Sequence, residues 1–369
     1  TPKPSSAASD VYKRQEVGSS AERFSLSPDE FHALSAERAA THPHAMLATA
    51  THDHKRGEDT RARLAALSEA PDEWIALAQA WVPRLARPGP IAPADAYLLL
   101  QSLVGAWPLA LPSEPSDDAL ADYLARIAQW QEKALREAKL RTSWTDPDAG
   151  YEQAAQRCVD ALQESNEGQG LLREIAAYTL RLAPAGLVNS LAQALLRCTL
   201  PGVPDLYQGA DLWDFSLVDP DNRRPVDYPT RTGLLALDDP GTPIATSAAA
   251  WQSGAIKQAL IRRALALRAR DPALFSDGRC EALAVSGPQA AHALAYVRRH
   301  ETRWVLVVAP RLCARALALY AQGQAGQAHR FWDGTRIQLP PGLPAADLVD
   351  ALSGRCLLYT SDAADEGLG

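Results

Sequence analysis

The feature that most constrains the fold is a long helical stretch between two short apolar segments. From Gly57 to about Leu182, apolar residues recur at intervals of three and four, which is the period of an amphipathic helix. Each of the two apolar segments, 45–50 and 203–207, has the length of one strand. Short runs of this kind are typical of buried strands in a parallel sheet. The sequence therefore predicts an α/β protein in which a helical block separates two buried strands.

Further elements are predicted around these segments. Ser27 and Glu30 have the spacing of a capping box, which predicts a helix that continues to about Thr41. Beyond Glu281 polar and apolar residues alternate, which predicts a small β domain at the end of the chain. Further helices are expected over 94–103, 117–142, 151–182, 187–200 and 251–270. The strands of the β domain are expected over 291–298, 304–309 and 330–339.

Composition excludes several classes of protein. The chain has 369 residues with 37 basic and 44 acidic side chains, so its net charge is −7. A phosphate-binding groove usually needs a basic surplus, so no nucleic-acid partner is expected. No apolar run approaches the ~18 residues of a membrane helix, so no membrane partner is expected. Five scattered cysteines without a CxxC motif favour free thiols in a reducing compartment, which predicts a cytoplasmic location.

The two ends of the chain differ from the sequence around them. Residues 5–15 (SSAASDVYKRQ) and 357–366 (LLYTSDAADE) resemble translated adapter sequence of the kind found at the edges of fragmentary genes. On this interpretation 1–15 and 356–369 are non-native tails, and catalytic residues can lie upstream of residue 1. The alternative is that both are natural disordered tails.

The first polar cluster, 51–59, follows the first predicted strand directly and is rich in ionisable side chains. A fixed carboxylate beside an imidazole is useful where positive charge develops on a substrate, as in glycoside cleavage. Asp53 is the candidate for that catalytic role, with His52 and Lys55 as candidates for binding hydroxyl groups. The alternative is a solvated loop.

A metal site is the second alternative for the same cluster. His52 and His54 form an H-x-H pair, as do His42 and His44, and on a strand such a pair points to one face and suits zinc. No third or fourth ligand is evident, however, and His42 and His44 flank a proline at a helix end. We therefore expect no metal and no cofactor.

The second polar cluster covers 205–215 and 219–228, after the second predicted strand. It interleaves aromatic residues with Asp, Asn, Gln and Arg, which is a usual lining for sugar rings because aromatic faces stack on them while planar polar groups bind hydroxyls. The alternative is a surface loop held by Asp–Arg salt bridges. The candidate substrate-binding residues of both clusters are His52, Lys55, Arg56, Tyr207, Gln208, Trp213, Asp214, Asp221, Asn222 and Arg223.

The helical block offers weaker signals. Its run 131–139 carries i,i+4 charge pairs such as Glu132–Arg136, and a solvated helix face is the simplest interpretation. Trp107 and Trp144 lie near expected helix ends and have two interpretations: contact with a ligand, or membership of the core, where tryptophans of such a block usually lie.

Three stretches carry a resemblance to a known family. They are HAMLATATHDHKRGEDTRARLAALSE, QEKALREAKLRTSW and LPGVPDLYQGADLWDFSLVDPDNRRPVDY. Together they resemble the maltooligosyltrehalose synthases, a branch of the alpha-amylase superfamily (glycoside hydrolase family 13), and the resemblance extends over nearly all of 16–355. A His-Asp pair alone would be weak evidence, whereas the third stretch is highly specific.

The resemblance implies an incomplete (β/α)₈ TIM barrel with a large helical insertion and a C-terminal β-sandwich domain. The two predicted strands would be barrel strands seven and eight. The implied organisation is a non-native tail 1–15, a barrel segment 16–60, the helical insertion 61–185, a second barrel segment 186–275, a truncated β domain 276–355 and a second tail 356–369.

The resemblance also implies residue roles. In this superfamily an Asp nucleophile, a Glu acid/base and a second Asp that stabilises the transition state act together; the last matches Asp53, and the family's substrate-binding His matches His52. The nucleophile and the acid/base would lie before residue 1, so the fragment alone is expected to be inactive.

The implied reaction is an intramolecular transglucosylation of maltooligosaccharides. It converts the reducing-end α-1,4 bond into an α,α-1,1 bond, and the product would pass to a maltooligosyltrehalose trehalohydrolase. Two alternatives stay open: another hydrolase or transglycosylase of the alpha-amylase family, and a non-catalytic helical binding module.

Overall fold

The computed structural model divides into two compact units that alternate along the chain, and each is described by itself. The first unit contains His52–Gly186 and Asp214–Arg224, and the second contains Leu26–Thr51, Leu187–Trp213 and the described residues from Pro225 onward. The structure describes residues 25–112, 115–239, 242–244, 247–324, 327, 330–342 and 348–357. The expected tail 1–15 and residues 358–369 of the second expected tail lie outside the described residues.

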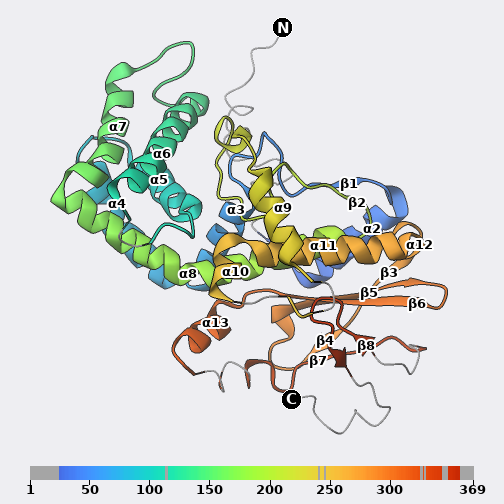
Figure 1. The fold of residues 1–369 in the computed structure, drawn as a ribbon. Helices are drawn as coiled ribbons and strands as arrows, with labels where there is room; N and C mark the ends of the chain where they lie inside the picture. Colours follow the sequence, from blue (N-terminus) through green and yellow to red (C-terminus); the bar gives the residue numbers. More distant parts are fainter. Residues whose placement is uncertain are drawn as a thin grey trace. The chain divides into compact units, whose positions relative to one another are not determined.

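The first unit consists of packed helices (Figure 1), which confirms the helical block predicted from the 57–182 periodicity. Its core is centred on α5 (Pro93–Ala106), where Leu99, Leu100 and Leu103 are fully buried. The other elements are α3 (Glu58–Ala65), η1 (Ala66–Glu69), α4 (Pro71–Ala86), α6 (Asp117–Ala138), α7 (Ala149–Glu164) and η2 (Asp221–Arg223).

Helix α8 corrects two predicted helix boundaries. It runs from Asn166 to Thr199 as one helix of 34 residues, where separate helices over 151–182 and 187–200 were predicted. The real break lies at Ser165, whose hydroxyl accepts a hydrogen bond from the Gly168 N–H 3.0 Å away and so caps the new helix. Pro184 lies inside α8 and does not end it. A proline has no backbone N–H, so the helix loses one hydrogen bond there but continues to Thr199.

The second unit begins with α2 (Pro28–Thr41), which confirms the predicted capping box. The Glu30 N–H donates to Ser27 Oγ over 3.2 Å, and the Ser27 N–H donates to Glu30 Oε2 over 2.8 Å. Among the described residues, no helix combines the length and the apolarity needed to cross a membrane.

Strands β1 (Met46–Leu47) and β2 (Val203–Pro204) pair in parallel, as their sequences predict. Both are shorter than expected, and the prediction that they are buried is wrong: Met46 is 68% exposed and Val203 46%. The physical reason is that these strands form a sheet of two, so each has only one strand beside it in the described structure.

The rest of the second unit mixes helices with antiparallel strands. Strands β3 (Arg279–Ala282), β5 (Ala293–His300) and β6 (Arg303–Pro310) form a sheet in the order β3-β5-β6, which confirms two of the three strands predicted for the β domain. The predicted strand 330–339 is a strand only in the short β7 (Arg336–Ile337), which follows η4 (Arg330–Trp332) and a turn. The remaining strands are β4 (Val285–Ser286), paired with β7, and β8 (Leu348–Val349), paired with β9 (Cys356–Leu357).

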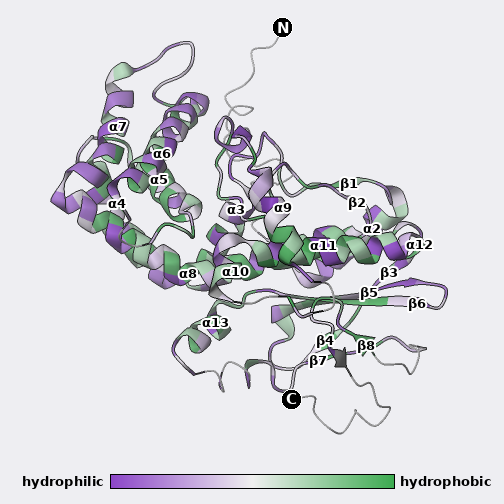
Figure 2. Cartoon of the chain, viewed as in Figure 1, coloured by the Kyte–Doolittle hydropathy of each residue, from purple (hydrophilic) through white to green (hydrophobic). Residues whose placement is uncertain are grey.

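The predicted helix 251–270 is divided by Gly254, whose φ of +81° is the left-handed conformation that ends α10 (Ala248–Ser253). Helix α11 (Ala255–Arg270) follows and supplies the buried Leu260 and Ile261, while Tyr296 and Val307 are buried on β5 and β6. Figure 2 shows hydrophobic segments along these same elements. The other elements are α9 (Tyr228–Leu237), α12 (Pro272–Ser276), η3 (Ala290–His292) and α13 (Ala314–Ala321). The mixed, helix-rich α/β class is thus confirmed.

Candidate functional site

His52 and Asp53 lie in a turn that follows β1 in the chain. His52 Nε2 lies 3.2 Å from Asp53 Oδ2, and the two side chains are 51% and 67% exposed. The pair is therefore accessible to a ligand, and the imidazole orients one oxygen of the carboxylate. This is the Asp–His arrangement that the first polar cluster predicts.

His54 takes a different environment from His52. His54 is 4% exposed, and 51–55 forms a turn rather than a strand. His52 and His54 therefore do not lie on a strand, and a strand is the geometric premise of the H-x-H zinc alternative. In the described ranges, no group of three or more His, Cys, Asp and Glu side chains lies close enough to hold a metal ion.

The buried half of the first cluster holds the loop in place. Asp59, in the first turn of α3, is 1% exposed and accepts a hydrogen bond from the Asp214 N–H. The Gly57 N–H donates to Ser216 O over 2.8 Å, and the Lys55 carbonyl accepts from the Val218 N–H over 3.1 Å. These contacts join the first cluster to 214–218, a segment that begins at the end of 205–215 and leads to 219–228.

The first unit contains four of the candidate residues from the second cluster: Asp214, Asp221, Asn222 and Arg223. Asp214 Oδ1 accepts from the Ser216 N–H over 3.1 Å, and Asn222 Nδ2 donates to His52 O over 3.0 Å. Asp221 is largely buried, whereas Arg223 is exposed and lies 3.8 Å from Asp219. The structure therefore brings Asn222 directly to His52, residues that are 170 positions apart.

Helix α6 contributes three charged residues that the sequence interpretation missed. Arg126 binds both oxygens of Asp221, at 2.8 and 2.9 Å. Lys133 Nζ lies 2.6 Å from Asp219 Oδ1. Glu137 Oε2 accepts from Lys55 Nζ over 2.9 Å, and Arg56 donates to Gln101 on α5.

The prediction that 131–139 is simply a solvated face is therefore only partly right. The expected Glu132–Arg136 pair is present at 2.8 Å, but Lys133 and Glu137 turn to the loops. A signal was available: with Arg126, they recur at seven and four positions, which places all three on one side of a helix.

These contacts lower the pKa values of two carboxyl groups, those of Asp219 and Asp221. The hydrogen bond from Lys133 is the largest effect that lowers the pKa of Asp219, and the nearby positive charges outweigh the opposing effect of burial. Burial by itself would raise the pKa of Asp221, but the hydrogen bonds and charge of Arg126 lower it overall. Both groups are therefore held as carboxylates near neutral pH.

The second unit holds the other three candidates: Tyr207 and Trp213, which are half-buried, and Gln208, which is exposed. Trp213 stacks on Trp251 with ring centroids 6.4 Å apart, and the fully buried Lys257 donates to Leu212 O over 3.1 Å.

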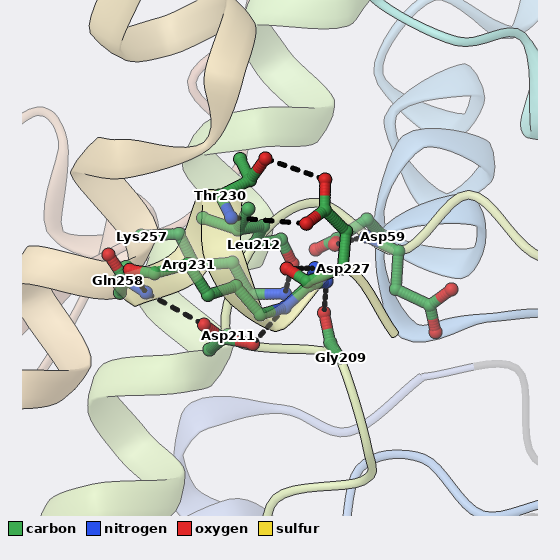
Figure 3. Close-up of polar contacts among 10 residues, drawn as sticks. Asp59, Gly209, Asp211, Leu212, Asp227, Thr230, Arg231, Lys257 and Gln258 are labelled. Atoms are coloured by element: carbon green, nitrogen blue, oxygen red, sulfur yellow. Dashed lines mark hydrogen bonds and ion pairs between the residues drawn. The ribbon is translucent and has the colours of Figure 1, made fainter. Parts of the chain in front are cut away.

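Arg231 fastens the 209–211 turn that follows Gln208, as Figure 3 shows. Its Nε donates to Asp211 Oδ1 over 2.9 Å and its Nη2 to Gly209 O over 2.7 Å. Gln258 donates to the other oxygen of Asp211, also over 2.9 Å. Both carboxylate oxygens of Asp211 thus accept hydrogen bonds that hold this turn in place.

The two tryptophans of the helical block differ. Trp107 is fully buried, and its Nε1 donates to Leu111 O, so it is a core residue. Trp144 is 56% exposed, and its ring lies 4.8 Å from the guanidinium carbon of Arg136.

Comparison with known proteins shows what the chain resembles. No family model matches it. It is 36% identical over 344 residues to the putative maltooligosyl trehalose synthases of two Mycobacterium tuberculosis strains, H37Rv and CDC 1551, which covers 92% of this chain and 38% of those proteins.

Solved structures agree with the sequence comparison. The maltooligosyltrehalose synthase of Arthrobacter ramosus superposes with a TM-score of 0.72 at 34% identity, covering 94% of this chain and 40% of that one. A hypothetical maltooligosyl trehalose synthase from Sulfolobus tokodaii superposes with a TM-score of 0.64 at 29% identity, covering 81% of this chain and 38% of that one. The chain spans about two fifths of the length of these proteins. By sequence and by fold, it is a relative of the maltooligosyl trehalose synthases over the region that it matches.

Proposed function

We propose that this chain is part of a maltooligosyl trehalose synthase, an isomerase that turns the reducing-end α-1,4 bond of a maltooligosaccharide into an α,α-1,1 bond. The observation that carries the proposal is the 36% identity over 92% of the chain, together with the solved structures of the same name. The accessible His52–Asp53 pair supports it, because a carboxylate there can stabilise an oxocarbenium-like transition state.

The finer architecture belongs to the same proposal. β1 and β2 would be strands seven and eight of a (β/α)₈ barrel, with 61–185 as a helical insertion and 276–355 as a β-sandwich domain. Their parallel pairing supports this, as does the polar cluster that follows each strand in the chain, because such barrels carry their chemistry after the carboxyl ends of the strands.

Within the first unit, Asp53 would stabilise the cationic sugar ring while His52 orients its carboxylate and binds a hydroxyl group. Lys55, Arg56, Asn222 and Arg223 would bind further hydroxyls. Asp214 and Asp221, which accept hydrogen bonds inside the unit, would act through the loop that they shape. In the second unit, Tyr207, Gln208 and Trp213 would contact sugar by stacking and hydrogen bonding.

The nucleophile and the acid/base are proposed to come from the part of the family's length that this chain does not match. Retaining chemistry needs those two groups about 5–5.5 Å apart, so the 369-residue chain alone would be inactive. The released glucose must be held away from water and attack through its anomeric hydroxyl, or hydrolysis would win. The product would then go to a trehalohydrolase, and we place the reaction in the cytoplasm.

The test is a hybrid enzyme in which the matched residues of this chain replace those of the Arthrobacter ramosus protein. Incubated with maltohexaose, it should form a non-reducing product of unchanged mass. Asp53→Asn should lower the rate on the order of 10³-fold, because the charge that stabilises the transition state is lost. Asp122→Asn, an exposed position on α6, is the matched control and should keep the rate.

Three results would count against the proposal. Glucose and maltose formed without a non-reducing product would indicate a hydrolytic relative in the alpha-amylase family. An active hybrid in which Asp53→Asn changes nothing would favour a helical binding role for this part. A folded but inactive hybrid, with folding checked by circular dichroism, would also count against the proposal.

A further inference from the structure

One side of α6 carries a line of charges that reaches both loops of the first unit. Arg126, Lys133 and Glu137 are seven and four residues apart, so their side chains project from the same side of the helix. Each binds a loop residue of opposite charge: Asp221, Asp219 and Lys55 respectively.

The charges form a connected chain rather than isolated pairs. Lys55 Nζ lies 2.9 Å from Glu137 Oε2, and Glu137 Oε1 lies 3.6 Å from Lys133 Nζ. Lys133 Nζ also donates to the side chain and the carbonyl of Asp219, over 2.6 and 2.8 Å. Positive and negative groups therefore alternate from the 52–56 loop to the 217–223 loop by way of α6.

The two loops also bind each other directly, so α6 and the two loops form a closed ring of contacts. Asn222 donates to the His52 carbonyl over 3.0 Å, and Arg56 forms an isolated β-bridge with Leu217. A change on α6 can therefore reach His52 through the contacts between the two loops.

Burial decides which links hold most firmly. The side chains of Arg126 and Asp221 are 19% and 9% exposed, so salt screens this pair weakly. Those of Lys133 and Asp219 are 19% and 32% exposed, which places this pair between the other two. Lys55 and Glu137 are 40% and 32% exposed. An ammonium group has three N–H donors, so Lys55 can bind Glu137 and still donate to a ligand.

We propose that α6 is the positioning element for the 52–56 and 217–223 loops, with Lys133 and Glu137 as positioning residues that fix Lys55 and the backbone of His52. The inference rests on the proposed function only in assigning sugar binding to these loops. On this view the helical block determines the geometry of the sugar-binding loops, in addition to any part it plays as a cover.

The first experiment measures amide hydrogen exchange in the 369-residue chain and needs no activity. In Lys133→Met and Glu137→Gln, peptides covering 52–56 and 217–223 should exchange about tenfold faster, while α4 and α5 stay protected. Lys133→Arg keeps the charge and should keep the protection. Glu132→Gln, which breaks an ion pair on the same helix that reaches neither loop, is the matched control.

Exchange that stays unchanged in both loops would overturn the proposal. Faster exchange over the whole first unit in Lys133→Met would also overturn it, because the residue would then be a general stabiliser. In Glu137→Gln, faster exchange near Lys55 with unchanged exchange in the 217–223 loop would show that α6 does not couple the two loops, and would contradict the proposal.

The second experiment uses the hybrid enzyme. Glu137→Gln should raise KM for maltohexaose and increase the share of glucose released, because a misplaced Lys55 holds the sugar less firmly, while Glu132→Gln should change neither. Loosened loops with unchanged KM and product ratio would reject the role of α6 in the reaction and leave the proposed function intact. An inactive parent hybrid would count against the proposed function, while the exchange result would still decide whether α6 positions the loops.

Discussion

Arg126 grips Asp221 with two parallel hydrogen bonds, from Nε to Oδ1 over 2.8 Å and from Nη2 to Oδ2 over 2.9 Å. The same Nη2 donates to the carbonyl of Phe215 over 3.2 Å. Asp221 in turn accepts from the Leu217 N–H over 2.8 Å. One guanidinium group on α6 thereby fixes both ends of the 215–221 loop, in the fork geometry that makes arginine a strong partner for a carboxylate.

Replacing Arg126 should therefore be costly. Arg126→Met leaves the carboxylate of Asp221 buried without its main partner, and the free energy of unfolding should fall by about 3 kcal/mol. Urea unfolding followed by circular dichroism measures the change. Arg87→Met is the matched control, because Arg87 and its partner Glu167 are 65% and 50% exposed, and it should cost at most about 1 kcal/mol. Equal losses in the two variants would contradict the assigned role.

Stability should fall in acid because of Asp219 and Asp221. Their pKa values in the folded chain lie below the reference value of 3.8. Each carboxylate therefore contributes stability above that value and loses it as the pH falls through the lowered folded pKa. The free energy of unfolding should thus decline below about pH 5 and fall steepest below about pH 4.

The acid prediction is checked by urea unfolding at a series of pH values. Asp219→Asn should flatten the decline, and so should Lys133→Met, since the hydrogen bond from Lys133 is the largest effect that lowers the pKa of Asp219. Glu152 and Glu174 also have lowered pKa values, so part of the slope should survive in both variants. A slope that neither variant changes would contradict the prediction.

Gly57 is predicted to be intolerant of a side chain. A Cβ atom at this position would lie 2.7 Å from the Asp214 carbonyl oxygen, which is backbone and cannot move aside cheaply. Gly57→Ala should therefore lower the free energy of unfolding by about 1–3 kcal/mol. Gly170→Ala in α8 is the opposite case, because nothing lies within 4 Å of its Cβ, and it should gain about 0.4–1 kcal/mol. Urea unfolding measures both changes in the free energy of unfolding. A Gly57→Ala variant as stable as the parent would contradict the prediction.

Arg63 is predicted to be the main stabiliser of the α5 end. It is fully buried, and its Nη1 donates to the carbonyls of Val104, Gly105 and Trp107 over 3.2, 3.0 and 2.6 Å, which are groups that a helix end leaves without internal partners. Burial lowers the pKa of this guanidinium to about 9, and its carbon lies 3.9 Å above the Phe215 ring.

Arg63→Met keeps the bulk but removes the donors, so the free energy of unfolding should fall by about 2–4 kcal/mol. Arg63→Lys keeps N–H donors but lacks the planar fork, so its free energy of unfolding should lie between those of the parent and Arg63→Met. Arg157→Met at an exposed site should stay within about 0.5 kcal/mol of the parent in the same urea experiment. If Arg63→Met left the free energy of unfolding unchanged, water would have to replace Arg63 as the hydrogen-bond donor to these carbonyls, and the assigned role would be wrong.

Local signals in the sequence determined the elements that depend on local chemistry. The spacing of Ser27 and Glu30 predicted the start of α2, and apolar periodicity predicted the helical block, because caps and helix faces depend on residues within one or two turns. The boundary at Ser165 was missed because a serine competes with continued helix only weakly, and sequence alone does not say which of Ser165 and Pro184 ends a helix.

For the site, the sequence determined which residue types are present and in what order: His52 beside Asp53, and aromatic residues among amides and acids. Only the tertiary structure decided which of them remain accessible. It buried His54 and Asp59, exposed Asp53 and brought Asn222 to His52. It also turned Lys133 and Glu137 of a seemingly solvated helix face towards Asp219 and Lys55. The physical reason is that a charge pair between residues about 80 positions apart depends on how helices and loops pack, and no local periodicity in the sequence encodes that distance.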